Sequence, residues 1–110
     1  SERVEVVKLH TTDYNGEEII TRLWVVDYGG YQYLRVGADG SGWFDRLRAA
    51  EMVDITRNGR RYRYSWTTRR SKSAQINELM RDKYGWGDSF IGYLTGGRGG
   101  SIPIELRLAQ

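Results

Sequence analysis

The sequence predicts an α+β fold in which six antiparallel strands curl into a small barrel with short helices packed at its open ends. Three observations lead to this expectation. Runs of alternating apolar and polar residues recur along the chain. Clear two-residue turn signals, Gly29-Gly30 and Asn58-Gly59, join neighbouring runs. The helical patterns are few and brief, and 110 residues without a shift in composition indicate one domain, residues 1–110.

The first three strands are expected at residues 3–12, 17–26 and 31–37. The first two are rich in β-branched residues, and Asn15-Gly16 between them is a strong signal for a tight hairpin turn. The second run is long for one strand, and we expect it to bend at a corner of the barrel.

The hairpin around Gly29-Gly30 is expected to gather aromatic residues on one face. The tight turn predicts the cross-strand neighbours Tyr28 and Tyr31, Val26 and Tyr33, and Trp24 and Arg35. The opposite face is expected to be core and carries Leu23, Val25, Leu34 and Val36. So many large aromatic rings are too apolar for a solvated surface, even with an arginine among them. A helix, a second subunit or a flat ligand should therefore cover this face.

The middle of the chain predicts a short helix and another hairpin. Ser41 is a candidate cap for a helix over residues 42–50. Strands are expected at residues 53–57 and 60–68, and the Asn58-Gly59 turn sets their register. This register turns Tyr62 and Tyr64 toward the core and places Asp54 opposite Arg63 as an oppositely charged pair.

The last third predicts two helices and a final strand. A helix is expected over residues 74–84, capped by Ser73 and ended by Gly85, with a second short helix over residues 88–94. The glycine-rich residues 96–100 lack the features of a nucleotide P-loop and are expected to form a flexible rim or lid. Residues 102–108 alternate as a strand, and Pro103 predicts a sheet edge or a bulge there.

Composition excludes several classes of site. The chain has no cysteine and one histidine, so a disulfide framework, a thiolate metal site and a histidine cluster are all excluded, and no metal site is predicted. His10 is expected to be a structural group. A net charge of +3 favours an anionic ligand. No apolar run spans a membrane and no signal peptide is visible, so a cytoplasmic protein is expected.

An anion site is predicted next to the glycine-rich break after residue 36. Arg22 and Arg35 are expected near one strand end, where an arginine fork suits a phosphate. Backbone N–H groups at Gly40 and Ser41, at the start of a helix, would add to it. The alternative is that the arginines stack on Trp24 across the hairpin.

Several motifs in order resemble the split β-barrel flavin-binding superfamily, and within it the small deazaflavin-dependent nitroreductase-like proteins and their relatives. The motifs that carry the resemblance are Thr11-Thr12, Thr21-Arg22-Leu23-Trp24-Val25-Val26, Tyr33-Leu34-Arg35-Val36, Gly42-Trp43-Phe44-Asp45-Arg46-Leu47, Asn58-Gly59-Arg60, Lys83-Tyr84-Gly85 and Ile102-Pro103-Ile104-Glu105-Leu106. The resemblance implies a homodimer that binds FMN or a deazaflavin coenzyme between subunits and acts as an oxidoreductase by hydride transfer.

Seven residues are assigned to the cofactor on this basis. Arg22 and Arg35 would hold phosphate, Trp24 and Trp43 would wall the ring system, and the backbone at Gly37, Gly40 and Ser41 would complete the tail site. No acid–base pair stands out, so no catalytic residue is named. Two alternatives stay open: a ligand-free structural dimer, and a non-catalytic basic β-barrel module that binds nucleic acid or another anion through the arginines and tyrosines of residues 60–72.

Overall fold

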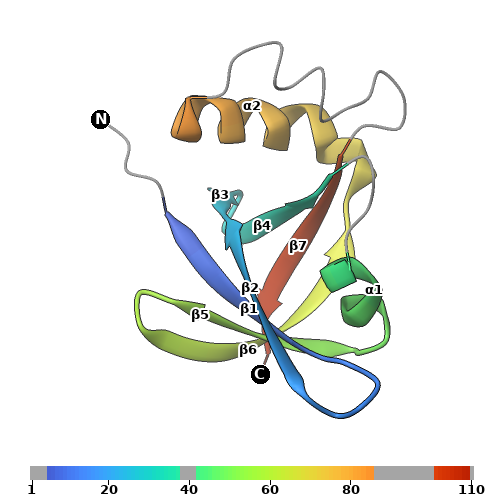
Figure 1. The fold of residues 1–110 in the computed structure, drawn as a ribbon. Coiled ribbons are helices and arrows are strands. Elements are labelled where there is room, and N and C mark those ends of the chain that lie inside the picture. Colours follow the sequence, from blue (N-terminus) through green and yellow to red (C-terminus); the bar gives the residue numbers. More distant parts are fainter. Residues whose placement is uncertain (1–4, 38–41, 86–100, 110) are drawn as a thin grey trace.

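The computed structural model describes residues 5–37, 42–85 and 101–109. Within these ranges the chain forms an antiparallel sheet, two α-helices and one 3₁₀ turn (Figure 1). The elements are β1 (Val6–Thr12), β2 (Glu18–Trp24), β3 (Val26–Tyr28), β4 (Tyr31–Val36), α1 (Gly42–Arg48), β5 (Met52–Arg57), β6 (Arg60–Thr68), η1 (Arg70–Lys72), α2 (Ser73–Tyr84) and β7 (Ile102–Leu108).

The sheet has seven strands in the order β2-β1-β5-β6-β7-β4-β3, and every neighbouring pair is antiparallel. The two outermost strands, β2 and β3, follow one another directly in the chain. The sheet therefore curls into a half-barrel whose edges are joined by the polypeptide. Figure 1 shows α2 lying across one end of the curled sheet and α1 beside the sheet.

The strand count corrects the expected six to seven. The single strand expected over residues 17–26 bends, as predicted, but the bend separates it into β2 and β3 around Val25. β2 pairs with β1 up to Trp24, whereas β3 begins at Val26 and pairs with β4. Val25 and Val26 are both buried, at 0% and 3% exposure, because Val25 packs in the main core and Val26 packs in the smaller cluster with α2.

The core lies in two layers. The larger cluster fills the inside of the curled sheet and includes Val25, Leu34 and Val36, as the hairpin alternation predicted. The smaller cluster lies between the other face of the hairpin and α2, where Val26 and Tyr33 pack with Ile76 and Met80. Of the three covers expected for the aromatic face, the structure therefore shows a helix over this part of it.

Both turn-centred registers are confirmed. Val26 lies opposite Tyr33 and Tyr28 opposite Tyr31, as Gly29-Gly30 predicted. Asp54 lies opposite Arg63, as Asn58-Gly59 predicted. The expected pairing of Trp24 with Arg35 is not part of the strand ladder, because β2 ends at Trp24 before β3 begins.

Pro103 does not mark a sheet edge. It lies in β7, a central strand between β6 and β4, and is opposite Arg35 of β4. The carbonyl of Pro103 accepts a hydrogen bond from the Arg69 backbone N–H at 3.0 Å, beyond the last β6–β7 pair at Thr68 and Ile104. In an antiparallel strand the N–H and C=O of one residue point toward the same neighbouring strand. The Pro103 nitrogen therefore faces the end of β6, where strand pairing has stopped and no N–H donor is needed.

Ser73 does not cap α2 as expected. The helix begins at Ser73 itself after the η1 turn, and its cap residue, Lys72, makes no side-chain cap hydrogen bond. The Ser73 hydroxyl instead donates to the Ser101 carbonyl at 2.9 Å and so joins α2 to the start of β7. Gly85 ends the helix in the left-handed conformation, as predicted. The helix expected over residues 88–94, the loop at 96–100 and the Ser41 cap lie outside the described residues.

Candidate functional site

A cleft of about 190 Å³ lies where the end of β2 meets β4 and α2. Its lining includes Arg22, Trp24 and Arg35, together with Leu23 and Met80. The structure thus brings together the two arginines and the tryptophan that the sequence assigned to one site, although Trp24 and Arg35 are not ladder partners. A positively charged cleft with an indole in its wall can accept an anionic group attached to a flat ring.

The sheet and α2 fix the position of Trp24. The indole is stacked on the Tyr84 ring, with centroids 4.3 Å apart and an interplanar angle of 3°. The Tyr84 hydroxyl in turn contacts the backbone of Val25, to whose carbonyl it lies at 2.8 Å. The indole is therefore held by the last turn of α2, with one of its faces covered by a ring of the same chain.

Arg35 is the more enclosed of the two arginines. Arg22 is exposed on β2, whereas Arg35 is partly buried between β7 and the cleft. Burial lowers the pKa of Arg35 to about 10, so its guanidinium stays charged at neutral pH. A cation with reduced hydration attracts an anion more strongly than one in bulk water does.

Of the remaining residues assigned from the sequence, Gly37 and Trp43 are among the described residues. Gly37 directly follows β4, and Gly40 and Ser41 lie outside the described residues. Trp43 is only 7% exposed and packs edge-on to Phe44 in the main core, with ring centroids 6.1 Å apart. Helix α1 is amphipathic and turns Trp43, Phe44 and Leu47 inward, so Trp43 does not line this cleft.

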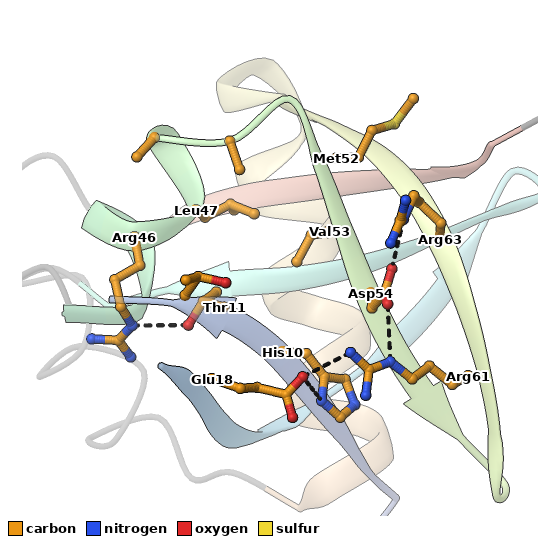
Figure 2. Close-up of a pocket in the computed structure, with 13 residues that line it drawn as sticks. His10, Thr11, Glu18, Arg46, Leu47, Met52, Val53, Asp54, Arg61 and Arg63 are labelled. Carbon is orange, nitrogen blue, oxygen red and sulfur yellow. Dashed lines mark hydrogen bonds and ion pairs between the residues drawn. The ribbon is translucent and has the colours of Figure 1, made fainter. Parts of the chain in front are cut away.

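A larger pocket of about 510 Å³ opens between α1 and strands β1, β5 and β6. Figure 2 shows a chain of charged side chains along it. Glu18 and Asp54 are bridged by Arg61, whose nitrogens lie 2.7 Å and 2.9 Å from the two carboxylates, and Asp54 also accepts from Arg63 at 3.0 Å. His10 borders this network and makes a 2.7 Å hydrogen bond to the Thr56 hydroxyl through Nε2.

The network keeps both carboxylates ionised. The hydrogen bond from Arg61 lowers the pKa of Glu18, and the hydrogen bond from Arg63 lowers that of Asp54. The sequence predicted only the Asp54–Arg63 pair, because the Asn58-Gly59 turn sets it locally. Bringing His10 and Glu18 to this place requires the pairing of β1 with β5, which no short-range signal encodes.

Two arginines of the basic strand proposed for nucleic-acid binding are paired with carboxylates. Arg61 contacts Glu18 of β2 and Asp54 of β5, and Arg63 also contacts Asp54. The two tyrosines expected to face the core differ: Tyr64 is 6% exposed, whereas Tyr62, which lies closer to the Asn58-Gly59 turn, is 48% exposed. Arg61 and Arg63 are thus less available to an anionic polymer than the sequence alone suggested.

Within residues 5–37, 42–85 and 101–109, no helix combines the length and apolar character that crossing a bilayer requires. In the same ranges, no three or more acidic or histidine side chains are grouped to hold a metal ion.

No protein-family model matches the sequence, and no curated protein matches it significantly. Solved structures do match the fold. A putative pyridoxamine 5′-phosphate oxidase from Listeria innocua has a TM-score of 0.68 at 11% identity, over 96% of this chain and 85% of that one. An F420 reductase has a TM-score of 0.67 at 14% identity, over 99% and 90%.

A third match, the heme storage protein HutZ from Vibrio cholerae, has a TM-score of 0.68 at 12% identity, over 98% of this chain and 84% of that one. These identities are low, so the likeness establishes the fold alone. The chain therefore shares the fold of these proteins, which confirms the split β-barrel fold that the resemblance implied.

Proposed function

We propose that this protein binds a flavin-type cofactor, FMN or a deazaflavin coenzyme, at the Arg22–Trp24–Arg35 cleft and serves as an oxidoreductase in a homodimer. The single observation that supports this most strongly is the meeting of two guanidinium groups and an indole in one cleft of a split barrel. The donor set suits a phosphate beside an aromatic ring.

The residues of the cleft have separate roles in this proposal. Arg35, partly desolvated and charged, binds a phosphate with two parallel N–H donors. Arg22 supplies a second cation from the exposed face of β2. Trp24 is stacked on Tyr84, so it offers its remaining surface to the edge of the ring system. When bound, the cofactor supplies the hydride chemistry, and the protein supplies position and charge.

The size of the cleft supports a second subunit. Its volume of about 190 Å³ is below the roughly 300–1,000 Å³ of pockets that enclose a small-molecule ligand. One copy of the described residues therefore holds one end of a cofactor and leaves the ring system open. In the proposed homodimer, the second copy covers the exposed face of the ring.

The test is a titration of the purified protein with FMN and with a deazaflavin coenzyme, followed by cofactor fluorescence. We expect saturable binding that weakens at least about tenfold in Arg35→Gln and in Arg22→Gln, since each removes a charged donor to phosphate. Arg60→Gln, which changes an exposed arginine at the β5–β6 turn, is the matched control and is expected to bind as wild type. Sedimentation of the loaded protein should give the mass of a dimer.

Two results would contradict the proposal. One is a set of titrations in which the wild-type protein and both cleft variants superimpose. The other is binding of single-stranded oligonucleotides that falls steeply with salt while neither cofactor binds, which would favour the basic module instead. Arg22 is exposed, so its variant remains informative even if Arg35→Gln reduces the yield of folded protein.

A further inference from the structure

The larger pocket between α1 and the β1–β5–β6 strands has one charged side and one apolar side. Its volume of about 510 Å³ falls within the range of small-molecule sites. The apolar side is formed by Leu47, Ala49, Ala50, Met52 and Val53. Met52 is 45% exposed, so a large apolar side chain remains open to solvent at this site.

Arg46 supplies a positive charge that no carboxylate of the described residues balances. Arg46 of α1 lies at the edge of the pocket lining, and its Nε donates to the Thr11 hydroxyl at 2.8 Å, which fixes the direction of the side chain. The other two arginines of the lining, Arg61 and Arg63, are engaged by Glu18 and Asp54. Figure 2 shows Arg46 apart from that network, bonded only to Thr11 among the side chains drawn.

The charges along the pocket select a singly charged ligand. Among the described residues, its lining contains three arginines and two carboxylates, so one positive charge of these five groups remains. A monoanion matches this excess. A phosphate monoester carries nearly two negative charges at neutral pH and would meet repulsion from Glu18 and Asp54 in the same space.

We infer that this pocket binds a small monocarboxylate with an apolar body. The carboxylate accepts hydrogen bonds from the terminal nitrogens of Arg46, and the apolar body lies against Leu47, Met52 and Val53. The inference does not depend on the proposed cofactor, because the pocket and the cofactor cleft have no described lining residue in common.

His10 provides a reporter inside the pocket. It is the single histidine of the chain, and its side chain is 7% exposed. Nε2 is bonded to Thr56, whereas Nδ1 is buried without a hydrogen bond and lies 3.5 Å from the nearest Glu18 oxygen. A ligand that changes the field or the solvent in the pocket will shift the resonances of this one imidazole.

The experiment follows the His10 imidazole protons by NMR at constant ionic strength and pH, with hexanoate, acetate, 1-hexanol and hexyl phosphate as probes. We expect hexanoate to give a saturable shift. Acetate lacks the apolar body and hexanol lacks the charge, so each should bind at least about tenfold more weakly. Hexyl phosphate should also bind more weakly, because of its second charge.

Variants locate the carboxylate. Arg46→Gln should weaken hexanoate binding at least about tenfold. Arg48→Gln is the matched control, since Arg48 lies on the same helix but pairs with exposed Asp45 and does not line this pocket. Met52→Glu places a negative charge at the exposed apolar side and should also weaken binding, which gives a second test if Arg46→Gln folds poorly.

Three results would overturn the inference. The first is a linear shift of equal size for hexanoate and acetate. The second is unchanged hexanoate binding in Arg46→Gln. The third is tighter binding of hexyl phosphate than of hexanoate, which would assign the pocket to a phosphate. None of these outcomes bears on FMN binding at Arg35, so the two proposals fail independently.

Discussion

At the scale of single residues, Glu105 is a buried carboxylate that stays ionised because of its hydrogen bonds. Its side chain is completely buried on β7. Burial alone would raise the pKa of Glu105, but hydrogen bonds from Tyr33, Arg69 and Arg107 outweigh it and hold the pKa at about 2. The Tyr33 hydroxyl donates at 2.5 Å, and the Arg107 Nε lies 2.9 Å from the other carboxylate oxygen. Glu105 therefore holds the buried Tyr33 hydroxyl and the partly exposed Arg69 and Arg107 side chains in place.

We predict that Glu105→Gln destabilises the protein by about 1–3 kcal/mol, the usual cost of leaving buried hydrogen-bonding groups poorly matched. The amide keeps the shape of the side chain but cannot accept from all of these donors. The cost stays moderate because Arg69 and Arg107 are 38% and 46% exposed and can regain hydration. Urea unfolding checks the value. An unchanged midpoint would show that the buried carboxylate contributes nothing to stability.

At the scale of elements, the break between β2 and β3 depends on α2. The backbone N–H of Val25 donates to the Tyr84 hydroxyl at 3.1 Å, and Lys83 Nζ donates to the Val25 carbonyl at 3.0 Å. These contacts satisfy backbone groups that leave the strand ladder at the bend. The last turn of α2 thus replaces strand pairing at the one place where the half-barrel turns its corner.

We predict that Tyr84→Phe lowers the free energy of unfolding by about 1–2 kcal/mol, because the stack on Trp24 remains while the bonds to Val25 are lost. Tyr62→Phe, at a half-exposed site on β6, is the control and should unfold as wild type. Equal stability of the two variants would mean that water satisfies the bend as well as the hydroxyl does.

How far the sequence predicts these elements depends on the range of the contacts. Turns such as Asn58-Gly59 set a register over a few residues, so the Asp54–Arg63 pair and the paired rings of β3 and β4 could be predicted. The bend of the long second strand could be predicted from its length, but its position at Val25 could not, because the contacts that hold it come from α2, about sixty residues later. The same reason hides the pocket around His10, which needs β1 beside β5. Arg22, Trp24 and Arg35 were assigned to one site from a hairpin register that does not extend as far as Trp24, and the structure brings them together where the end of β2 meets β4 and α2.

At the scale of the whole molecule, one ion-pair network joins distant segments. Arg57, at the end of β5, contacts Glu5 at 2.6 Å before β1 and Asp27 at 2.9 Å on β3. Lys83 of α2 also contacts Glu5, at 2.7 Å. The network therefore links the N-terminal strand, the β5–β6 hairpin, the far edge of the sheet and α2, and its strength depends on the ionisation of Glu5.

The acid stability of the fold follows from Glu5 and Glu105 together. The hydrogen bond from Arg57 lowers the pKa of Glu5 to about 2, with Lys83 adding to it against the effect of burial. Both carboxylates have a folded pKa of about 2 and an ordinary value of 4.5. A group with a lowered folded pKa stabilises the protein above its unfolded pKa and loses that contribution as pH falls toward the folded value.

We therefore predict that the contribution of these two groups to the free energy of unfolding is constant above about pH 5 and falls between pH 4.5 and pH 2. Urea titrations at a series of pH values measure the profile. The double variant Glu5→Gln/Glu105→Gln should start less stable at neutral pH and show a shallower acid slope. Glu78→Gln removes an exposed carboxylate of α2 and should run parallel to wild type. A double variant whose slope equals that of wild type would place the acid sensitivity elsewhere, since protonation of Glu5 and Glu105 would then be uncoupled from unfolding.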